Sequence, residues 1–400
     1  MTRKGIIALL FTSFHLIAAG QSVTGTKKLS NNRYFAIRGG LNNFYDAISI
    51  RKEATVAFVG GSITFNPGWR EKVCDYLTKK FPAIHFRFIA AGIPSLGSLP
   101  HSFRLQRDVL DSGKIDLLFF EAAVNDRANG TDSLAQVRAL EGIIRHAFKK
   151  NSRTDILLMS FADPDKNNEY AKNFTPVEVT NHERIAAYYN LPSINLAKEI
   201  SDRLEHKEFS WEKDFLDLHP SPFGQQLYFE TIKVLLDTCF KQTGSSKKHR
   251  LPVALDKYNF DKGRYVSTSK AHYDQGWTLD KDWVPSDDLP TRNGFVHQPM
   301  LISTTPGSVL HFKFKGNAAG IAIVSGADAG IISYSIDGSA FEKHNLFTNW
   351  SSSLHLPWYI LLGSGLKSGS HELEIKIDAD KDPRSKGNAC RIVYFLVNGI

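Results

Sequence analysis

The chain has only three cysteines among its 400 residues, Cys74, Cys239 and Cys390. They are too few and too widely spaced for a disulfide framework or for the paired cysteines of a zinc site. Cys74 and Cys239 fall in helix-like segments, where a cysteine usually serves as a small buried apolar residue. We therefore expect free thiols and no zinc site, and a single Cys74–Cys239 bridge is the less favoured alternative.

Long apolar runs are missing beyond the N-terminus. Past residue 20, no segment approaches the ~18 continuous apolar residues that a membrane-spanning helix needs. The run at residues 6–19 follows Arg3 and Lys4 and ends in Ala18-Ala19-Gly20. A basic start, a short apolar stretch and small residues at its end are typical of a cleavable signal peptide. The sequence thus predicts that residues 1–20 are a signal peptide and that the protein is secreted or periplasmic, without a membrane span.

Blocks of Lys and Arg interleaved with aromatic residues, which indicate nucleic-acid binding, are also missing. The formal net charge of +8 is spread over a long chain. Its densest cluster, Lys247-Lys248-His249-Arg250, falls in a predicted linker. We interpret this charge as a solvated surface and expect no nucleic-acid partner. A basic surface also suits an acidic polysaccharide, but the sequence signal for one is weak.

Between about residues 55 and 244, short apolar segments alternate with segments of helical length. The predicted strands are residues 55–59, 86–90, 116–120, 156–159 and 193–196, and the predicted helices are residues 70–80, 134–150, 177–189 and 223–239. This alternation is typical of right-handed β-α-β crossovers, which build a mostly parallel sheet covered on both faces. The sequence therefore predicts an α/β domain over residues 51–243, after an N-terminal extension at residues 21–50.

The pattern changes after residue 243. Residues 244–262 begin with Gly, Ser and Lys and indicate a linker. From residue 263 to residue 400 the segments are short, often alternate between apolar and polar residues, and are separated by Gly, Asp and Ser. The pair Asp337-Gly338 after an alternating run is a strong hairpin signal. We predict an all-β, jelly-roll-like sandwich over residues 263–400.

Four positions in the α/β segment carry the chemistry. Ser62 follows the first predicted strand, Gly92 the second and Asn125 the third, while His219 precedes the last helix. Because reactive groups of an open parallel sheet gather beyond the carboxyl ends of its strands, we expect these residues to meet at one edge. Taken singly, each has a plainer interpretation as a turn or a helix cap. Jointly they predict an active site.

These residue types suit acyl transfer. The Ser62 Oγ attacks a carbonyl carbon, and His219 takes its proton and later returns it to the leaving alcohol. The N–H groups of Ser62 and Gly92 and the side-chain amide of Asn125 form the oxyanion hole. A carboxylate is expected to orient the His219 imidazole and to stabilise its protonated form.

The same residues resemble the sequence blocks of the SGNH, or GDSL-like, hydrolases. Gly60-Gly61-Ser62-Ile63-Thr64 matches the first block, Ala91-Gly92 with Gly97 the second, Val124-Asn125-Asp126 the third and His219-Pro220 the last. The resemblance covers roughly residues 50 to 243. It implies a flavodoxin-like α/β/α fold, no metal or other cofactor, and ester hydrolysis by Ser62 and His219.

With Trp69-Arg70 shortly after it, the first block also resembles that of secreted bacterial carbohydrate esterases with attached β-sandwich modules. Several of these remove O-acetyl groups from polysaccharides. Two departures from the family pattern concern Ala123, where the third block carries a glycine, and the acid partner of His219. The family places an aspartate three residues before the histidine, and this position is Leu216. Our first choice is Asp217, and the alternative is a Ser–His dyad in which a backbone carbonyl orients the ring.

Three more residues near the predicted crevice, Trp69, Arg70 and His101, are candidates for substrate binding, with packing as the alternative role. In the β segment, the aromatic cluster formed by Trp350, His355, Trp358 and Tyr359 suits either sugar stacking or core packing.

We thus predict a secreted serine esterase that acts on O-acyl esters, O-acetyl esters first of all, of a polysaccharide or oligosaccharide. The alternatives are a lipase or arylesterase acting on other esters, and a catalytically inactive carbohydrate-binding protein. The displaced aspartate is the feature that supports inactivity.

Overall fold

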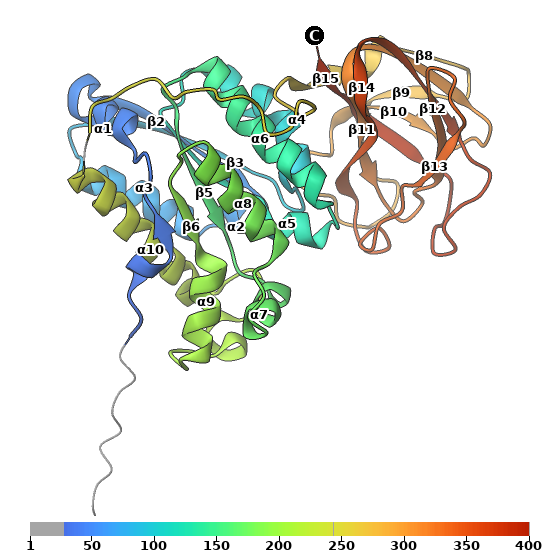
Figure 1. Ribbon diagram of the computed structural model, residues 1–400. Helices are drawn as coiled ribbons and strands as arrows, with labels where there is room; N and C mark the ends of the chain where they lie inside the picture. Colours follow the sequence, from blue (N-terminus) through green and yellow to red (C-terminus); the bar gives the residue numbers. More distant parts are fainter. Residues whose placement is uncertain (1–27, 243, 400) are drawn as a thin grey trace, which may run out of the picture.

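The structure is a computed structural model, and it describes residues 28–242 and 244–399. The predicted signal peptide lies outside the described residues. An α/β part is built by residues up to 242 and an all-β part by residues from 263 (Figure 1). Within the described ranges, no helix combines the length and the apolar character that crossing a membrane requires.

A 6-stranded sheet with the order β1-β6-β5-β4-β2-β3 forms the centre of the α/β part. Its strands are β1 (Phe35–Ala36), β2 (Glu53–Gly60), β3 (His85–Gly92), β4 (Leu117–Glu121), β5 (Asp155–Ser160) and β6 (Ser193–Asn195). Strands β2 to β6 run parallel, and β1 pairs antiparallel with β6. With β2 between β3 and β4, the parallel strands have the flavodoxin-like order, which confirms the predicted fold class.

Helices cover both faces of this sheet (Figure 1). They are α1 (Asn42–Asp46), α2 (Ser62–Phe65), α3 (Trp69–Lys80), α4 (Ser98–Asp108), α5 (Ala123–Ala128), α6 (Ser133–Lys150), α7 (Pro164–Ala171), α8 (Val177–Tyr188), α9 (Leu196–Glu205) and α10 (Pro222–Lys241). Successive strand residues point to opposite faces, so Phe119 and Phe120 of β4 belong to two different cores. The first core includes Trp69 and Tyr228, and the second includes Ile144.

The segment predicted as an N-terminal extension packs onto the sheet from residue 28 onward. Phe35 pairs with Ile194 of β6, and Phe44 is wholly buried in the first core. Strand β1 thereby covers the backbone groups that β6 would otherwise present at an open sheet edge.

The all-β part is a 9-stranded antiparallel sheet that curls on itself. Its strands are β7 (Gly263–Ser267), β8 (Ala271–Tyr273), β9 (Thr278–Trp283), β10 (Gln298–Ser303), β11 (Val309–Ser325), β12 (Ile331–Ile336), β13 (Glu342–Asn345), β14 (Leu356–Ile377) and β15 (Cys390–Gly399). The long strands β11 and β14 pair with register shifts after Gly316 and Ala319, where bulges bend the sheet. Asp337 and Gly338 both have positive φ, as a two-residue hairpin turn between β12 and β13 requires. The predicted all-β fold is confirmed.

The two parts meet along α4. Phe103 of α4 packs against Phe260 at 5.3 Å between ring centroids. Tyr265 of β7 stacks on Tyr394 at 4.5 Å, and the Arg107 guanidinium lies 4.6 Å from the centroid of the Tyr265 ring. These contacts join the all-β part to the helical layer that covers one face of the catalytic sheet.

Candidate active site

Ser62 begins α2, directly beyond the carboxyl end of β2. A Cβ atom on Gly61 would lie 1.8 Å from Asn125 Oδ1, and one on Gly60 would lie 2.4 Å from Thr64 Oγ1. Only residues without a side chain permit these approaches. The Gly-Gly pair therefore explains how the turn places Ser62 at the edge of the sheet and against Asn125.

The structure brings Ser62 and His219 together. Ser62 Oγ lies 2.8 Å from His219 Nε2, a hydrogen-bond distance at which the hydroxyl donates to a neutral imidazole. His219 comes from the loop between η4 (Trp211–Phe215) and α10, and its side chain is 47% exposed. This is the arrangement expected of a nucleophile and its general base.

Asp217 lies beside His219 without a hydrogen bond to its ring. Its Oδ1 accepts a hydrogen bond from the backbone N–H of His219 at 2.5 Å and lies 3.6 Å from Nδ1. The Asp217 side chain is 69% exposed. Within the described ranges, no group forms a hydrogen bond with His219 Nδ1. Neither the carboxylate nor the backbone carbonyl considered from the sequence therefore completes a triad-like contact in this conformation.

The backbone before Asp217 makes an uncommon bend. Leu216, which occupies the aspartate position of the family pattern, has φ 81° and ψ −77° and a half-exposed side chain. These angles belong to a γ-turn that residues with side chains rarely adopt. Asp214, five residues before His219, does not supply a carboxylate to the His219 ring either, because its Oδ2 accepts a hydrogen bond from the backbone N–H of Ser210 at 2.7 Å. The bend at Leu216 thus separates η4 from the segment that carries His219.

The other two predicted oxyanion residues, Gly92 and Asn125, lie beside the turn that carries Ser62. Gly92 of β3 pairs in register with Gly60 of β2, and a Cβ atom on it would lie 2.6 Å from the backbone nitrogen of Phe65. The loop after β3 is also fastened by the N–H of Ile93, which donates to the Gly60 carbonyl at 2.9 Å. Asn125 of α5 lies against the same turn through its contact with Gly61, described above. Ser62, Gly92 and Asn125 therefore converge at one edge of the sheet.

The buried Asp126 side chain links the helices that carry these loops. Its Oδ1 accepts hydrogen bonds from the N–H and the hydroxyl of Ser98, at 2.8 and 3.0 Å, and so ties α4 to α5. Burial raises the pKa of Asp126 to about 7, although the hydrogen bonds from Ser98 act in the opposite direction. From the sequence, Asp126 was expected only to be part of the third block, and its structural role was not predicted. Its position next to Asn125 was the one sequence feature that pointed to such a role.

Other ionisable groups beneath the site also hold backbone. The buried Glu121 accepts a hydrogen bond from the N–H of Val124 at 3.2 Å, and burial raises its pKa to about 7. Lys166 donates to the Ala123 carbonyl at 3.0 Å and contacts Asp163. Over the part of the chain that the structure describes, no three His, Cys, Asp or Glu side chains are grouped so that they could hold a metal ion.

The structure contradicts the predicted substrate contacts of Trp69 and His101, both of which are wholly buried. Trp69 packs edge-on against Phe58, and His101 Nδ1 lies 3.2 Å from the Arg104 guanidinium. The helices α3 and α4 turn these residues toward the core, which their position near the crevice did not reveal.

Arg70 has a partner other than substrate. It donates to the carbonyl oxygens of Thr64 and Phe65, at 3.0 and 3.3 Å, and thus holds α2 from behind. The structure therefore places Arg70 as a support of the serine turn.

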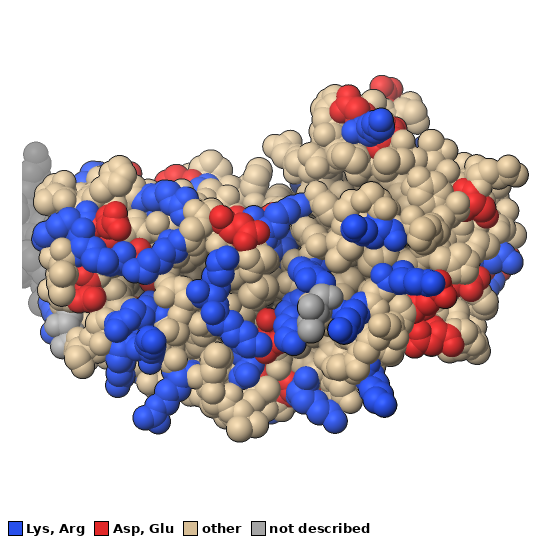
Figure 2. All heavy atoms as spheres, turned by 90° about the horizontal axis from the view of Figure 1, so that it is seen from above, with Lys and Arg blue, Asp and Glu red and all other residues tan. Residues whose placement is uncertain are grey.

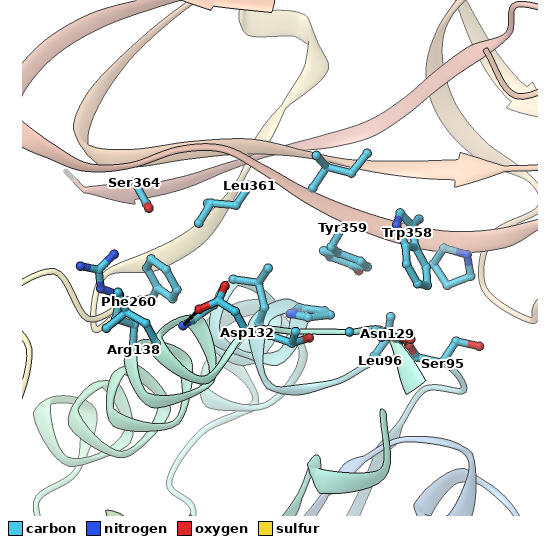
Figure 3. Close-up of a pocket in the computed structure, with 18 of the residues that line it drawn as sticks. Ser95, Leu96, Asn129, Asp132, Arg138, Phe260, Trp358, Tyr359, Leu361 and Ser364 are labelled. Carbon is cyan, nitrogen blue, oxygen red and sulfur yellow. Dashed lines mark hydrogen bonds between the residues drawn. The ribbon is translucent and has the colours of Figure 1, made fainter. Parts of the chain in front are cut away.

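A pocket of about 430 Å³ lies between the two parts, beside the loop that follows β3 and the segment that follows α5 (Figure 3). Ser95, Leu96 and Asn129 line it from the α/β part, and Trp358 and Tyr359 line it from β14. The Leu96 carbonyl oxygen would lie 3.6 Å from a Cβ atom on Gly61. Leu96, one of the lining residues, therefore packs against the turn that precedes Ser62.

The aromatic residues singled out in the all-β part differ in exposure: some pack in the core, and Trp358 is partly exposed in the pocket. Tyr359 is buried, and its hydroxyl lies 2.5 Å from the Tyr265 hydroxyl. His355 is also buried, and packs edge-on against Trp283. Trp358 is only partly buried, lines the pocket and contacts Trp350 at 5.8 Å between ring centroids.

Residues 58–227 match the sequence model of the GDSL-like Lipase/Acylhydrolase family. Comparison with curated proteins gives no match. The fold is similar to that of a two-domain esterase active on acetylated mannans, co-crystallised with mannopentaose, with a TM-score of 0.74 and 18% sequence identity over 93% of this chain and 99% of that chain. A second structure of a two-domain esterase active on acetylated mannans gives a TM-score of 0.73 at the same identity and coverage.

An acetylxylan esterase from Geobacillus stearothermophilus is similar over 46% of this chain and 94% of that chain, with 18% identity and a TM-score of 0.36. The mannan-esterase comparison spans both parts, so the two-part architecture is a known fold.

Proposed function

We propose that this protein, a carboxylic ester hydrolase whose residues 58–227 match the GDSL-like lipase/acylhydrolase family model, removes O-acyl groups from a polysaccharide or oligosaccharide, O-acetyl groups first of all. The observation that carries the proposal is the 2.8 Å contact between Ser62 Oγ and His219 Nε2, beside Gly92 and Asn125. A glycan substrate is supported by the shared fold of the two-domain esterase active on acetylated mannans.

In the proposed reaction, Ser62 Oγ attacks the ester carbonyl carbon while His219 Nε2 takes the hydroxyl proton. The N–H groups of Ser62 and Gly92 and the Asn125 amide donate to the oxyanion of the tetrahedral intermediate. His219 then gives its proton to the leaving sugar oxygen, the C–O bond breaks, and an acyl-Ser62 remains. Water attacks this ester with His219 as base, which releases the acid and restores Ser62.

The pocket between the two parts supports a polymeric substrate over a small ester. The partly exposed ring of Trp358 offers an aromatic face of the kind that suits a sugar ring. Leu96 lines this pocket and packs against the turn before Ser62, so the pocket lies on the same side of the sheet as the candidate nucleophile. Export through the predicted signal peptide fits such a substrate, which cannot enter a cell as a polymer.

One observation favours a second candidate function. Asp217 Oδ1 lies 3.6 Å from His219 Nδ1 and is exposed, so the base has no buried acid behind it. A carbohydrate-binding protein with little hydrolytic activity would have the same feature.

Acetate release from acetylated mannan, acetylated xylan and p-nitrophenyl acetate tests the proposal. Ser62→Ala is expected to lower kcat/KM on p-nitrophenyl acetate by at least about 10³-fold, because the nucleophile is removed. Ser95→Ala makes the same chemical change at the same edge of the sheet and is expected to keep the wild-type rate on this small ester.

Undiminished turnover by Ser62→Ala would remove Ser62 as the nucleophile. Hydrolysis of p-nitrophenyl acetate without acetate release from any glycan would favour the arylesterase alternative. An inactive wild-type protein that still binds a glycan would establish the second candidate.

A further inference from the structure

A second hollow lies at the opposite end of the sheet from Ser62. It has a volume of about 830 Å³, and its lining includes most of the segment from Gly244 to Pro252 and Asp155, with which β5 begins. Because the strands run parallel, their amino ends meet at this edge and their carboxyl ends at the Ser62 edge. The hollow is therefore separate from the candidate active site.

The segment that lines this hollow is held in place, although its composition predicted a linker. Asp155 is almost wholly buried, and its Oδ1 lies 3.0 Å from Asn43 Nδ2 and 2.7 Å from His249 Nε2. The His249 ring stacks on Phe148 at 4.6 Å, and Asn43 Oδ1 accepts the backbone N–H of Lys247 at 3.0 Å. The backbone on either side of His249 is thus anchored to the α/β part.

The cations of this segment point away from these anchors. Lys247, Lys248 and Arg250 are exposed, and no acidic side chain of the described ranges lies within ion-pair distance of them. Figure 2 views the molecule from this side and shows many Lys and Arg on the surface of the α/β part, with several Asp and Glu among them. Charges on an anchored backbone lose less conformational freedom when they bind a ligand than charges on a mobile tether.

The basic character continues along the segment into a neighbouring hollow between the two parts. Lys257, Lys262 and Lys315 line that hollow without an acidic partner among the residues described. Asp261 also lines it, but its carboxylate pairs with Arg145 and Lys149. We call Lys247, Lys248, Arg250, Lys257 and Lys262 the linker face. Its residues follow one another along the chain from the first hollow to the second. The acids of this stretch, Asp256 and Asp261, are paired with cations of α6.

Helix ends explain part of the positive charge at this edge, but not the linker face. Lys79 and Lys80 end α3, and Lys149 and Lys150 end α6. Cations at these positions offset the partial negative charge of helix C-termini. The cations of the linker face belong to no helix, so this explanation does not apply to them.

We propose that the linker face binds an anionic polysaccharide, whose carboxylate or sulfate groups pair with Lys247, Lys248 and Arg250. The first hollow also offers an aromatic side chain that suits sugars, namely Tyr188, which is 40% exposed. A nucleic acid fits less well, because base stacking calls for several exposed aromatic rings. The second tyrosine of this hollow, Tyr189, is buried and donates to Glu141. The proposal is independent of the ester hydrolysis proposed above.

Binding of the full-length protein to polygalacturonate, to dextran sulfate and to neutral dextran tests this proposal. We expect binding to at least one anionic polymer, none to neutral dextran, and weaker binding as salt screens the charges. The polygalacturonate and dextran sulfate arms distinguish carboxylate from sulfate recognition.

The triple variant Lys247→Gln, Lys248→Gln, Arg250→Gln is expected to raise the Kd by about tenfold, through the loss of three exposed charge pairs. The matched control changes Lys172, Lys207 and Lys281 to Gln, which removes the same charge from exposed lysines elsewhere. It is expected to change the Kd by less than about twofold, since net charge alone acts weakly at moderate salt. Thermal unfolding of both variants, compared with the wild type, reports on their folding.

Three results would overturn the proposal. The first is equal loss of binding in both triple variants, as a net-charge effect would cause. The second is the absence of binding to either anionic polymer, and the third is tighter binding of duplex DNA than of either polymer at the same salt concentration.

Discussion

His219 meets Ser62 at hydrogen-bond distance, yet its own orientation depends on a weak partner. The Asp217 carboxylate lies 3.6 Å from Nδ1 and is 69% exposed. Two unit charges about 4 Å apart attract one another by only about 1 kcal/mol in a medium close to water. This is far less than a buried, hydrogen-bonded aspartate contributes to a catalytic triad. The base is therefore positioned mainly by its loop.

Asp217→Asn is accordingly expected to lower kcat/KM on p-nitrophenyl acetate by roughly five- to tenfold, which corresponds to about 1 kcal/mol. Loss of a triad aspartate that orients the base costs about 10⁴-fold in kcat. Glu212→Gln removes a neighbouring exposed carboxylate and serves as the control. A loss of about 10³-fold or more in Asp217→Asn would show that the carboxylate reaches Nδ1 when substrate binds.

At the scale of elements, α2 depends on its surroundings. Four residues are too few to hold a helical turn by themselves. Arg70 of α3 supplies the missing support by donating to the carbonyls of Thr64 and Phe65. A displacement of Ser62 by a fraction of an ångström changes its distance to His219 and to the oxyanion donors together.

Arg70→Ala is therefore expected to lower kcat by about ten- to a hundredfold with little change in KM for p-nitrophenyl acetate, since misplacement of a reacting group slows the chemical step. Arg70→Lys should recover part of the loss, because an ammonium reaches one carbonyl but lacks the guanidinium fork. Lys79→Ala, which removes an exposed cation from the same helix, is the control. A rise in KM with unchanged kcat would instead make Arg70 a substrate contact.

Elements with a strong local signal were predictable from the sequence. The apolar runs at residues 55–59 and 156–159 fall within β2 and β5, because strands buried on both faces need continuous apolar residues. The helices α4 and α9 were not predicted. Leu196 begins α9 directly after β6, so no turn residues mark the boundary, and the apolar face of α4 packs partly against the all-β part.

In the candidate site too, some positions follow from local sequence patterns and others depend on tertiary contacts. Ser62, Gly92 and Asn125 follow strand ends, so sheet topology alone predicts that they converge. The burial of His101 depends on which face of α4 turns inward, and the place of Asp217 depends on the bend at Leu216. Both are tertiary features without a local sequence signal.

At the scale of the whole molecule, the two parts share an apolar interface. The Arg107 guanidinium lies near the centroids of both stacked rings, at 4.6 Å from Tyr265 and 4.8 Å from Tyr394, and the Tyr265 hydroxyl contacts that of Tyr359. A Cβ atom on Gly263 would lie 2.5 Å from the Ser102 carbonyl oxygen, so the backbones of β7 and α4 approach closely. Such an interface couples the unfolding of one part to that of the other.

We expect a single thermal transition for the wild type. Tyr265→Ala should destabilise the interface by about 2–4 kcal/mol, because a large aromatic side chain is lost from a packed site, and should separate the transition into two. Scanning calorimetry measures both effects. Tyr265→Phe removes only the hydroxyl and is expected to keep one transition. An unchanged melting profile in Tyr265→Ala would show that the two parts are stabilised independently.

The three free thiols report on the two parts of the molecule separately: Cys239 and Cys390 are buried, and Cys74 is partly buried. Cys74 and Cys239 lie in the α/β part and Cys390 lies in β15, and burial raises the pKa of each to about 12. Since the thiolate is the reactive form, a thiol reagent at neutral pH finds almost no reactive sulfur in the folded protein. Each part thus contains its own chemical reporter of opening. The order in which Cys390 and the other two cysteines are modified records which part of the molecule unfolds first.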